Sequence, residues 1–289
     1  MKNFNAYADI EKVPLFTEGM EMQSKMYAVK MDVPIETETE RGKITTMQPH
    51  ECGTVSESFM LIPNNDVAMF SSDLVGSLDG QWDTHKTVFD SSKYMMTQLC
   101  TSDFASAELE VGDTVNLGIM WRNAYDMSTS LSMQMFLSVL SCLNGMQNRV
   151  WFPRMRFKHT PNNRNWKEVL SETKETITHA ANSMPEMAEN LNKLHRTKIG
   201  STDELAVLRK HVGKDILGHT QFGKVVDRFL TEEPASGGTH TLWDFTQACT
   251  HTFWNSNNDN SKINSWADLD TNEKCIRKLT AIGNIVSEA

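Results

Sequence analysis

The spacing of the apolar residues changes near residue 160, and this change limits the fold more than any other feature of the sequence. Before it, the apolar residues form short runs that are broken by Gly, Pro, Asn and Asp, as strands are. After it, they recur at intervals of three and four, as on one face of a helix. The sequence therefore predicts an α+β fold, with a mainly antiparallel sheet in the N-terminal half and a helical C-terminal half.

The N-terminal half contains several segments with the composition of strands, separated by turn residues. Glycine supplies the positive φ of a hairpin turn, so Gly112-Asp113 is predicted to join two strands. Leu131–Leu143 fits a strand or a helix, and we favour a strand because Met and Leu alternate there with Ser and Gln. The predicted strands are Ser56–Ile62, Thr87–Phe89, Tyr94–Leu99, Ala107–Val111, Thr114–Trp121, Leu131–Leu143 and Val150–His159, with a turn at Asn144-Gly145 and a helix from a capping Asp66 to about Leu78.

The C-terminal half is predicted to hold five helical segments. The first runs from Trp166 to Leu194, and Pro185 should kink or divide it. Ser201 or Thr202 can cap the second, which ends before a glycine. The second to fifth segments are Asp203–Leu217, Phe222–Leu230, Thr241–Trp254 and Asp270–Ser287.

These patterns divide the chain into three parts. Residues 1–50 are predicted to form an acidic, partly extended and loosely packed arm, because they hold Pro14, Pro34 and the charge run Glu36–Arg41. Residues 51–160 form the mainly β core. Residues 161–289 form a helical region that packs on the same core.

The composition is that of an ordinary globular protein. There are 28 Lys and Arg against 37 Asp and Glu, which gives a formal charge of −9, and 39% of the residues are hydrophobic. No run of about eighteen apolar residues is present, so we expect no membrane association. The first twelve residues lack the apolar stretch of a secretion signal, and we therefore expect a cytoplasmic protein.

No motif points to a reaction. The five cysteines are far apart and form no CxxC pair, so we expect reduced thiols without zinc or a disulfide. His240, Asp244 and His251 share a predicted helix but are spaced too widely for a compact metal site. Motifs of phosphate-binding loops, zinc peptidases, hydrolase nucleophiles and dinucleotide-binding folds are missing. We predict no catalytic residue, no metal and no cofactor, and an enzyme activity is unsupported.

The most informative segment is Gln147–Lys167, which carries six cations and no acidic residue in an otherwise acidic chain. Single-stranded nucleic acid is bound by cations that follow the phosphates and by flat side chains that stack on bases. On a strand, Arg154, Arg156 and Lys158 would share one solvent face. The alternative is a solvated basic face opposite a buried aromatic face. The candidate nucleic-acid-binding residues are Arg149, Trp151, Arg154, Arg156, Lys158, Arg164 and Lys167.

A second polar constellation consists of Trp121–Met127 (WRNAYDM) and Leu143–Met146 (LNGM). Its Asn and Asp residues are either turn formers or a polar site at the ends of strands. Neither segment has the partner residues of a known reaction.

Five segments together resemble one family. VSESFMLIPNNDVAMFSSDLV (55–75), GDTVNLGIMWRNAYDMSTSLSMQM (112–135), CLNGM (142–146), RFKHT (156–160) and THTLWDFTQACTHTFW (239–254) are similar, in this order, to phage- and plasmid-encoded proteins of domain of unknown function 932. The chain departs from the family pattern at Ala124, where a serine is common, at Met127, which replaces the glycine of a DG turn, and at Gln247. The resemblance implies a phage protein. Its layout also suggests a curved sheet with helices, as in phage strand-annealing proteins.

Together these observations predict a phage-encoded protein that binds single-stranded DNA in the cytoplasm of the infected host cell. It would act in replication or recombination as a homo-oligomer that anneals strands, because annealing needs no catalytic residue. The alternative is a phage protein that binds a host protein and inhibits or redirects it. In that case the acidic N-terminal arm would carry the function.

Overall fold

The structure is a computed structural model of the chain, and it describes residues 5–16, 23–39, 42–139, 144–146, 154–163, 165–213, 216–235, 237–254 and 266–287. The strands form two antiparallel sheets, one of three strands and one of seven. The small sheet has the order β1-β2-β3, with β1 Ile10–Phe16, β2 Gln23–Thr39 and β3 Gly42–Ser56. The large sheet has the order β10-β8-β7-β5-β4, with β6 beside β7 and β9 beside β8; the strands are β4 Trp82–Asp90, β5 Lys93–Cys100, β6 Ser106–Glu108, β7 Thr114–Ala124, β8 Leu131–Val139, β9 Asn144–Met146 and β10 Met155–Phe157.

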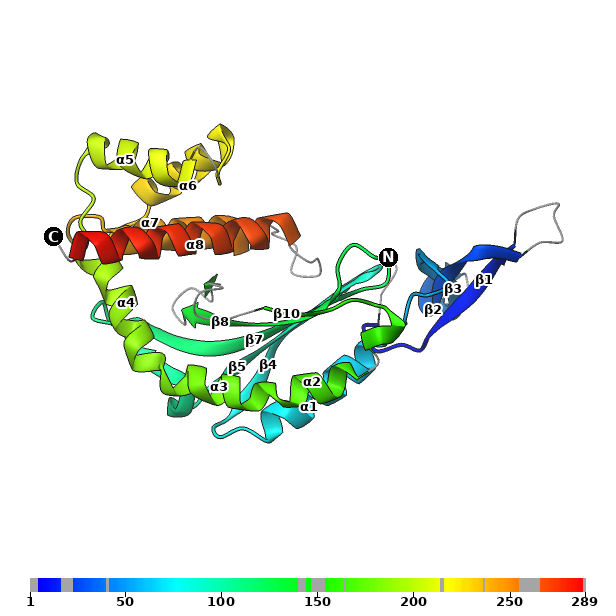
Figure 1. Cartoon of the computed structure of the whole chain (residues 1–289). Helices are drawn as coiled ribbons and strands as arrows, with labels where there is room; N and C mark the ends of the chain where they lie inside the picture. The colour runs from blue at the N-terminus through cyan, green and yellow to red at the C-terminus, as the bar shows by residue number, and fades with distance from the viewer. Residues whose placement is uncertain are drawn as a thin grey trace.

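The helices cover both faces of the large, curved sheet (Figure 1). α1, α2 and α3 lie along one face, α7 and α8 lie over the other, and α4 leads from one side to the other. The α-helices are α1 Asn64–Gly76, α2 Trp166–Ser171, α3 Thr173–Asn182, α4 Met184–Arg196, α5 Thr202–Leu208, α6 His219–Thr231, α7 Leu242–Trp254 and α8 Trp266–Ser287; short 3-10 turns lie at Asp103–Ala105 and Pro161–Asn163, and a π-helix at Arg209–Gly213. Within the part of the chain that the structure describes, no helix has the length and apolar character needed to cross a membrane.

Alternating residues of the central strand β7 serve two different faces of the sheet. Leu117, Ile119 and Trp121 are fully buried and belong to the main core, which continues into the helices. Met120 points to the other face, where it joins a small apolar cluster that includes Leu269 of α8. Both faces of β7 are therefore buried, as is common for a strand in the middle of a covered sheet.

The structure confirms the predicted α+β fold and the place where it changes. The last strand of the large sheet, β10, ends at Phe157, and α2 begins at Trp166. Gly112 has a φ of +86° between the paired strands β6 and β7, as expected for the hairpin. The ambiguous segment after Leu131 is a strand, β8, in its described residues.

Several local predictions were wrong. Ser56–Ile62 is not a strand, because β3 ends at Ser56 and Pro63 is the N-cap of α1, so Asp66 lies in the first turn instead of capping it. Asn144-Gly145 is not a turn but part of β9, which pairs with β8. The described part of Val150–His159 forms a strand only over Met155–Phe157.

The predicted helical segments are present, but two of them are divided. The first consists of α2, α3 and α4, and Pro185 stands at the start of α4, where proline is tolerated. In the second, Ser201 and Glu204 form a reciprocal capping box at the start of α5, which passes into the π-helix after Leu208.

The N-terminal arm is a sheet that packs on the rest of the chain. Val29, Met31 and Val33 of β2 are buried in the main core. Gly53 of β3 lies directly against Asp126, which follows the end of β7. A Cβ atom at position 53 would stand 2.7 Å from the Cα of Asp126. A larger residue at position 53 would force the arm away from the large sheet.

Candidate nucleic-acid interface

Three arginines gather on the sheet face that α8 covers, and we call them the arginine cluster: Arg122, Arg154 and Arg156. The strand register pairs Arg122 of β7 with Ser132 of β8, and Ser132 in turn with Arg156 of β10. Since neighbouring strands lie about 4.8 Å apart, the backbones of the two arginines are about 10 Å apart across the small serine. Arg154 lies two residues before Arg156 and so belongs to the same face.

Two carboxylates of α8 pair with this cluster. The Nη2 of Arg154 donates to Oδ1 of Asp270 at 2.9 Å and lies 3.4 Å from Oε2 of Glu273. The Nη1 of Arg122 is 3.7 Å from the same Asp270 oxygen. Arg154 also donates through Nε to Oε1 of Gln134 at 2.7 Å, so Gln134 fixes the plane of the guanidinium.

Burial and mutual repulsion determine the electrostatics of the arginine cluster. The pKa of Arg122 is lowered to about 9, first by burial and then by the charge of Arg154, while Asp270 and Glu273 oppose the change. Arg122 therefore remains protonated at neutral pH. Among the described side chains, Asp270 and Glu273 lie against Arg122 and Arg154, while Arg156 is exposed at the rim.

The structure brings together only part of the predicted basic set. Arg156 and Lys158 are exposed, as expected. Arg154 is not, because α8 covers it and its side chain is only 5% exposed, so the prediction of three cations on one solvent face was wrong for this residue. Lys167 lies on α2, beside the opposite face of the sheet, 3.9 Å from a carboxylate oxygen of Asp66. Arg149, Trp151 and Arg164 lie outside the described residues.

The described aromatic residues of the basic segment belong to the core. Phe157 and Trp166 are buried, and the ring of Trp166 meets that of Phe70 edge to face at 5.4 Å. These two rings are therefore packed against other side chains and are not exposed for stacking on bases. This part of the segment has the buried aromatic face that the alternative interpretation described.

The sequence patterns did not indicate that Arg122, Asp270 and Glu273 belong to this site. Arg122 stands in the second constellation, but periodicity gave no reason to separate it from its neighbours. The signal that could have found it is the strand pairing, which places Arg122 and Arg156 on one row of the sheet. The two acidic residues come from a helix more than 100 positions away, since Arg154 and Asp270 are 116 residues apart.

The second constellation, WRNAYDM, has a structural role at the start of α1. The Nδ2 of Asn123 donates to the carbonyl of Ile62 and to Oδ1 of Asn64, both at 2.9 Å. The hydroxyl of Tyr125 accepts from the backbone N–H of Asn64 at 2.8 Å. These contacts hold the N-terminus of α1 against the end of β7.

Two further motifs of the family resemblance, RFKHT and THTLW, also make structural contacts within the fold. His159, from RFKHT, stacks on Phe59 with a centroid distance of 4.5 Å, and burial lowers its pKa. Thr241, from THTLW, exchanges hydrogen bonds with Asp244 across the first turn of α7. Asp244 therefore acts in helix capping. Among the residues that the structure describes, no group of three or more His, Cys, Asp or Glu side chains is placed to hold a metal ion, and Cys52, Cys100, Cys249 and Cys275 are free thiols.

Met127 has a φ of +62°, which explains why a glycine is typical at this position of the motif. We expect Met127→Gly to stabilise the protein by about 0.5–1 kcal/mol. The left-handed backbone costs a non-glycine residue about 1–2 kcal/mol, and the greater freedom of glycine in the unfolded chain takes back part of the gain. Urea unfolding measures the difference. Met127→Ala is the matched control, since it removes the same side chain but keeps the strain; equal stability of the two variants would contradict the explanation.

The family model for a domain of unknown function (DUF932) matches residues 51–280. This range includes the large sheet, the arginine cluster and most of α8. No curated protein and no solved structure matches the chain.

Proposed function

The chain belongs to the DUF932 family, and on that premise we propose that it is a phage-encoded protein that binds single-stranded DNA in the cytoplasm of the infected cell. Its binding surface is the edge of the large sheet at β10, where Arg156 and Lys158 are exposed beside the buried Arg122 and Arg154. The proposed setting is phage replication or recombination, and the proposed activity is strand annealing by a homo-oligomer.

The observation that carries this proposal is the pair of exposed cations at the rim of the arginine cluster. Residues two apart on an extended chain stand about 7 Å apart, which is similar to the phosphate spacing of a stretched single strand. Arg156 and Lys158 can each neutralise one phosphate of the DNA backbone. Binding of the DNA backbone is sufficient for annealing, because bases that stay uncovered can pair with a complementary strand.

The test uses the double variant Arg156→Ala/Lys158→Ala and a fluorescently labelled oligothymidylate, with anisotropy measured over a range of KCl concentrations. We expect weaker binding and a salt slope smaller by about 1.4, because each lost phosphate contact on a single strand removes about 0.7.

The matched control is Lys174→Ala/Lys224→Ala, which removes two exposed lysines of α3 and α6 and changes the net charge equally. It should bind like the unmodified protein. If both double variants bind with the same affinity and slope as the unmodified protein, the surface at β10 is only a solvated face and the proposal fails.

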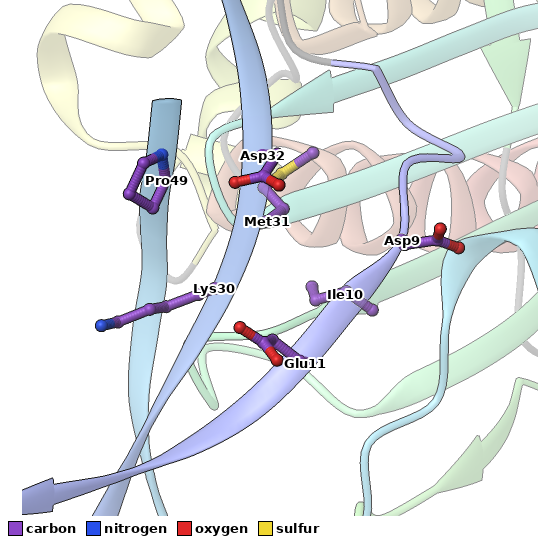
Figure 2. Close-up of a pocket in the computed structure, with 7 residues that line it drawn as sticks. All are labelled: Asp9, Ile10, Glu11, Lys30, Met31, Asp32 and Pro49. Carbon is purple, nitrogen blue, oxygen red and sulfur yellow. The ribbon is translucent and has the colours of Figure 1, made fainter. Parts of the chain in front are cut away.

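A hollow on the small sheet supports the alternative function, binding of a host protein. Figure 2 shows its seven lining residues, with Asp9 just before β1, Glu11 on β1, and Lys30 and Asp32 on β2. Three carboxylates against one lysine would suit a basic segment of a protein partner. Failure of oligonucleotide binding at low salt, together with an intact fold, would favour this alternative.

A further inference from the structure

The first turns of α8 lie directly on the arginine cluster. Asp270 and Glu273 are three residues apart on the helix and so share one face. The side chains of Arg154 and Glu273 are each only 5% exposed, whereas that of Asp270 is 37% exposed. Beside them, Leu269 is buried in the small apolar cluster that contains Met95 and Met120. Among the described side chains, α8 thus meets the arginine cluster through Asp270 and Glu273, and it meets the small apolar cluster through Leu269.

The two carboxylates engage the guanidinium N–H groups that Arg154 could otherwise offer to a phosphate. A guanidinium group binds carboxylates and phosphates through the same planar set of N–H donors. An ion pair that is buried gains little net free energy, because desolvation offsets the attraction. If two phosphates took the place of the two carboxylates of α8, Arg154 would therefore exchange its anionic partners with little change in free energy.

Resting on the function proposed above, we propose that the N-terminal end of α8 masks the arginine cluster, and that DNA phosphates displace Asp270 and Glu273 from Arg154 and Arg122. Arg156 and Lys158 would make the first contacts with DNA, since they are already exposed. Release of the mask would add two cations to the site.

The rest of α8 is anchored by a different part of the core. Cys275, Ile276 and Leu279 are fully buried, and they pack in the main core with α7. The thiols of Cys249 and Cys275 are in hydrogen-bond contact, and burial raises the pKa of Cys249. Among the described side chains, the first turns contribute Leu269 to the small apolar cluster, and we expect displacement to be confined to these turns.

The main test compares the affinity of a labelled oligothymidylate for the unmodified protein and for Asp270→Asn/Glu273→Gln. Removing the competing charges should tighten binding about tenfold, a size typical of coupling between two sites. The matched control is Glu175→Gln/Glu186→Gln, with two exposed carboxylates on α3 and α4 and the same change in net charge. It should change the affinity much less. An equal increase in both variants would show a bulk charge effect and overturn the mask.

Leu269→Ala tests the same idea without a change in charge and serves if the first variant does not fold. It should also tighten binding, because it weakens the apolar contact of the first turn, whereas Leu279→Ala in the anchored part should not. In the unmodified protein, addition of oligonucleotide should speed the hydrogen exchange of amides 270–274 relative to amides 276–280.

The outcomes separate the two proposals. If the oligonucleotide binds the unmodified protein, and neither Asp270→Asn/Glu273→Gln nor Leu269→Ala binds more tightly, the mask is wrong and the proposed function stands. If the unmodified protein and both variants fail to bind at any salt concentration, both proposals are wrong. Binding by the variants alone would support both.

Discussion

Replacing Trp121 with alanine should lower the free energy of unfolding by about 4 kcal/mol, as expected for the loss of a large buried aromatic side chain. Trp121 is fully buried on the central strand β7, and its ring meets that of Phe70 edge to face at 6.0 Å. Phe70 in turn contacts Trp166, so the three rings join the sheet to α1 and α2. The alanine variant would leave a cavity at this junction. Denaturant unfolding followed by circular dichroism measures the change.

The matched variant is Trp121→Phe, which keeps most of the ring volume. The indole Nε1 has no hydrogen-bond partner among the described residues, so the loss of its N–H costs nothing by itself. We expect a decrease of less than about 1.5 kcal/mol for this variant. A loss as large as that of Trp121→Ala would mean that the indole N–H, and not the packing of the ring, holds the junction together.

Replacing Arg154 with leucine should destabilise the protein by about 3 kcal/mol, because it removes a cation that pairs with the buried carboxylate of Glu273. The variant also removes the hydrogen bond to Gln134. Thermal or urea unfolding measures the effect. Arg156→Leu, two residues farther along the chain, is the control, and it should change the stability by less than about 0.5 kcal/mol because Arg156 is exposed.

A second substitution checks the physical cause. In the background of Arg154→Leu, Glu273→Gln removes the buried charge that has lost its contact with Arg154 and should recover part of the lost stability. Recovery by Glu273→Gln but not by the remote Glu186→Gln would assign the loss to the buried carboxylate. Without any recovery, the loss would come from the packing of the arginine stem.

The sequence predicts the main architecture well where local pattern and tertiary structure agree. β7 and β8 largely follow a period of two, interrupted at Met120 and Phe136, which join the small apolar cluster on the other face of the sheet. Gly112 marks the hairpin through its positive φ. The helices after residue 160 follow their apolar faces. The break between α3 and α4 follows from Pro185, but the break at Glu172 between α2 and α3 depends on local geometry that spacing does not contain.

The arm was harder to predict because its prolines argue against strands. Pro14 and Pro49 lie on the two outer strands of the small sheet, where a missing N–H is tolerated. Pro34 lies on the middle strand, but beyond the last pair that β2 makes with β1, Ile10–Met31. All three prolines therefore occupy positions next to an open edge, and only the pairing reveals this.

The candidate site was predicted only in part, because a basic segment does not specify its partners. Arg156 and Lys158 are exposed as expected, but Arg154 turns toward Asp270 and Glu273. That pairing depends on how α8 lies across the sheet, which no local pattern contains. DNA binding itself remains a prediction.

The β2–β3 ladder is one continuous hydrogen-bonded element with two different surroundings. Near the large sheet, Val29, Met31 and Val33 are buried in the core, so opening this end requires the core to open as well. Farther along the same ladder, Lys43–Met47 are all exposed and are held by their pairing with β2. The free energy of local opening must therefore fall steadily along the ladder, although the pairing is regular over most of its length. The arm is thus a place where the protein can lose order at one end without unfolding at the other.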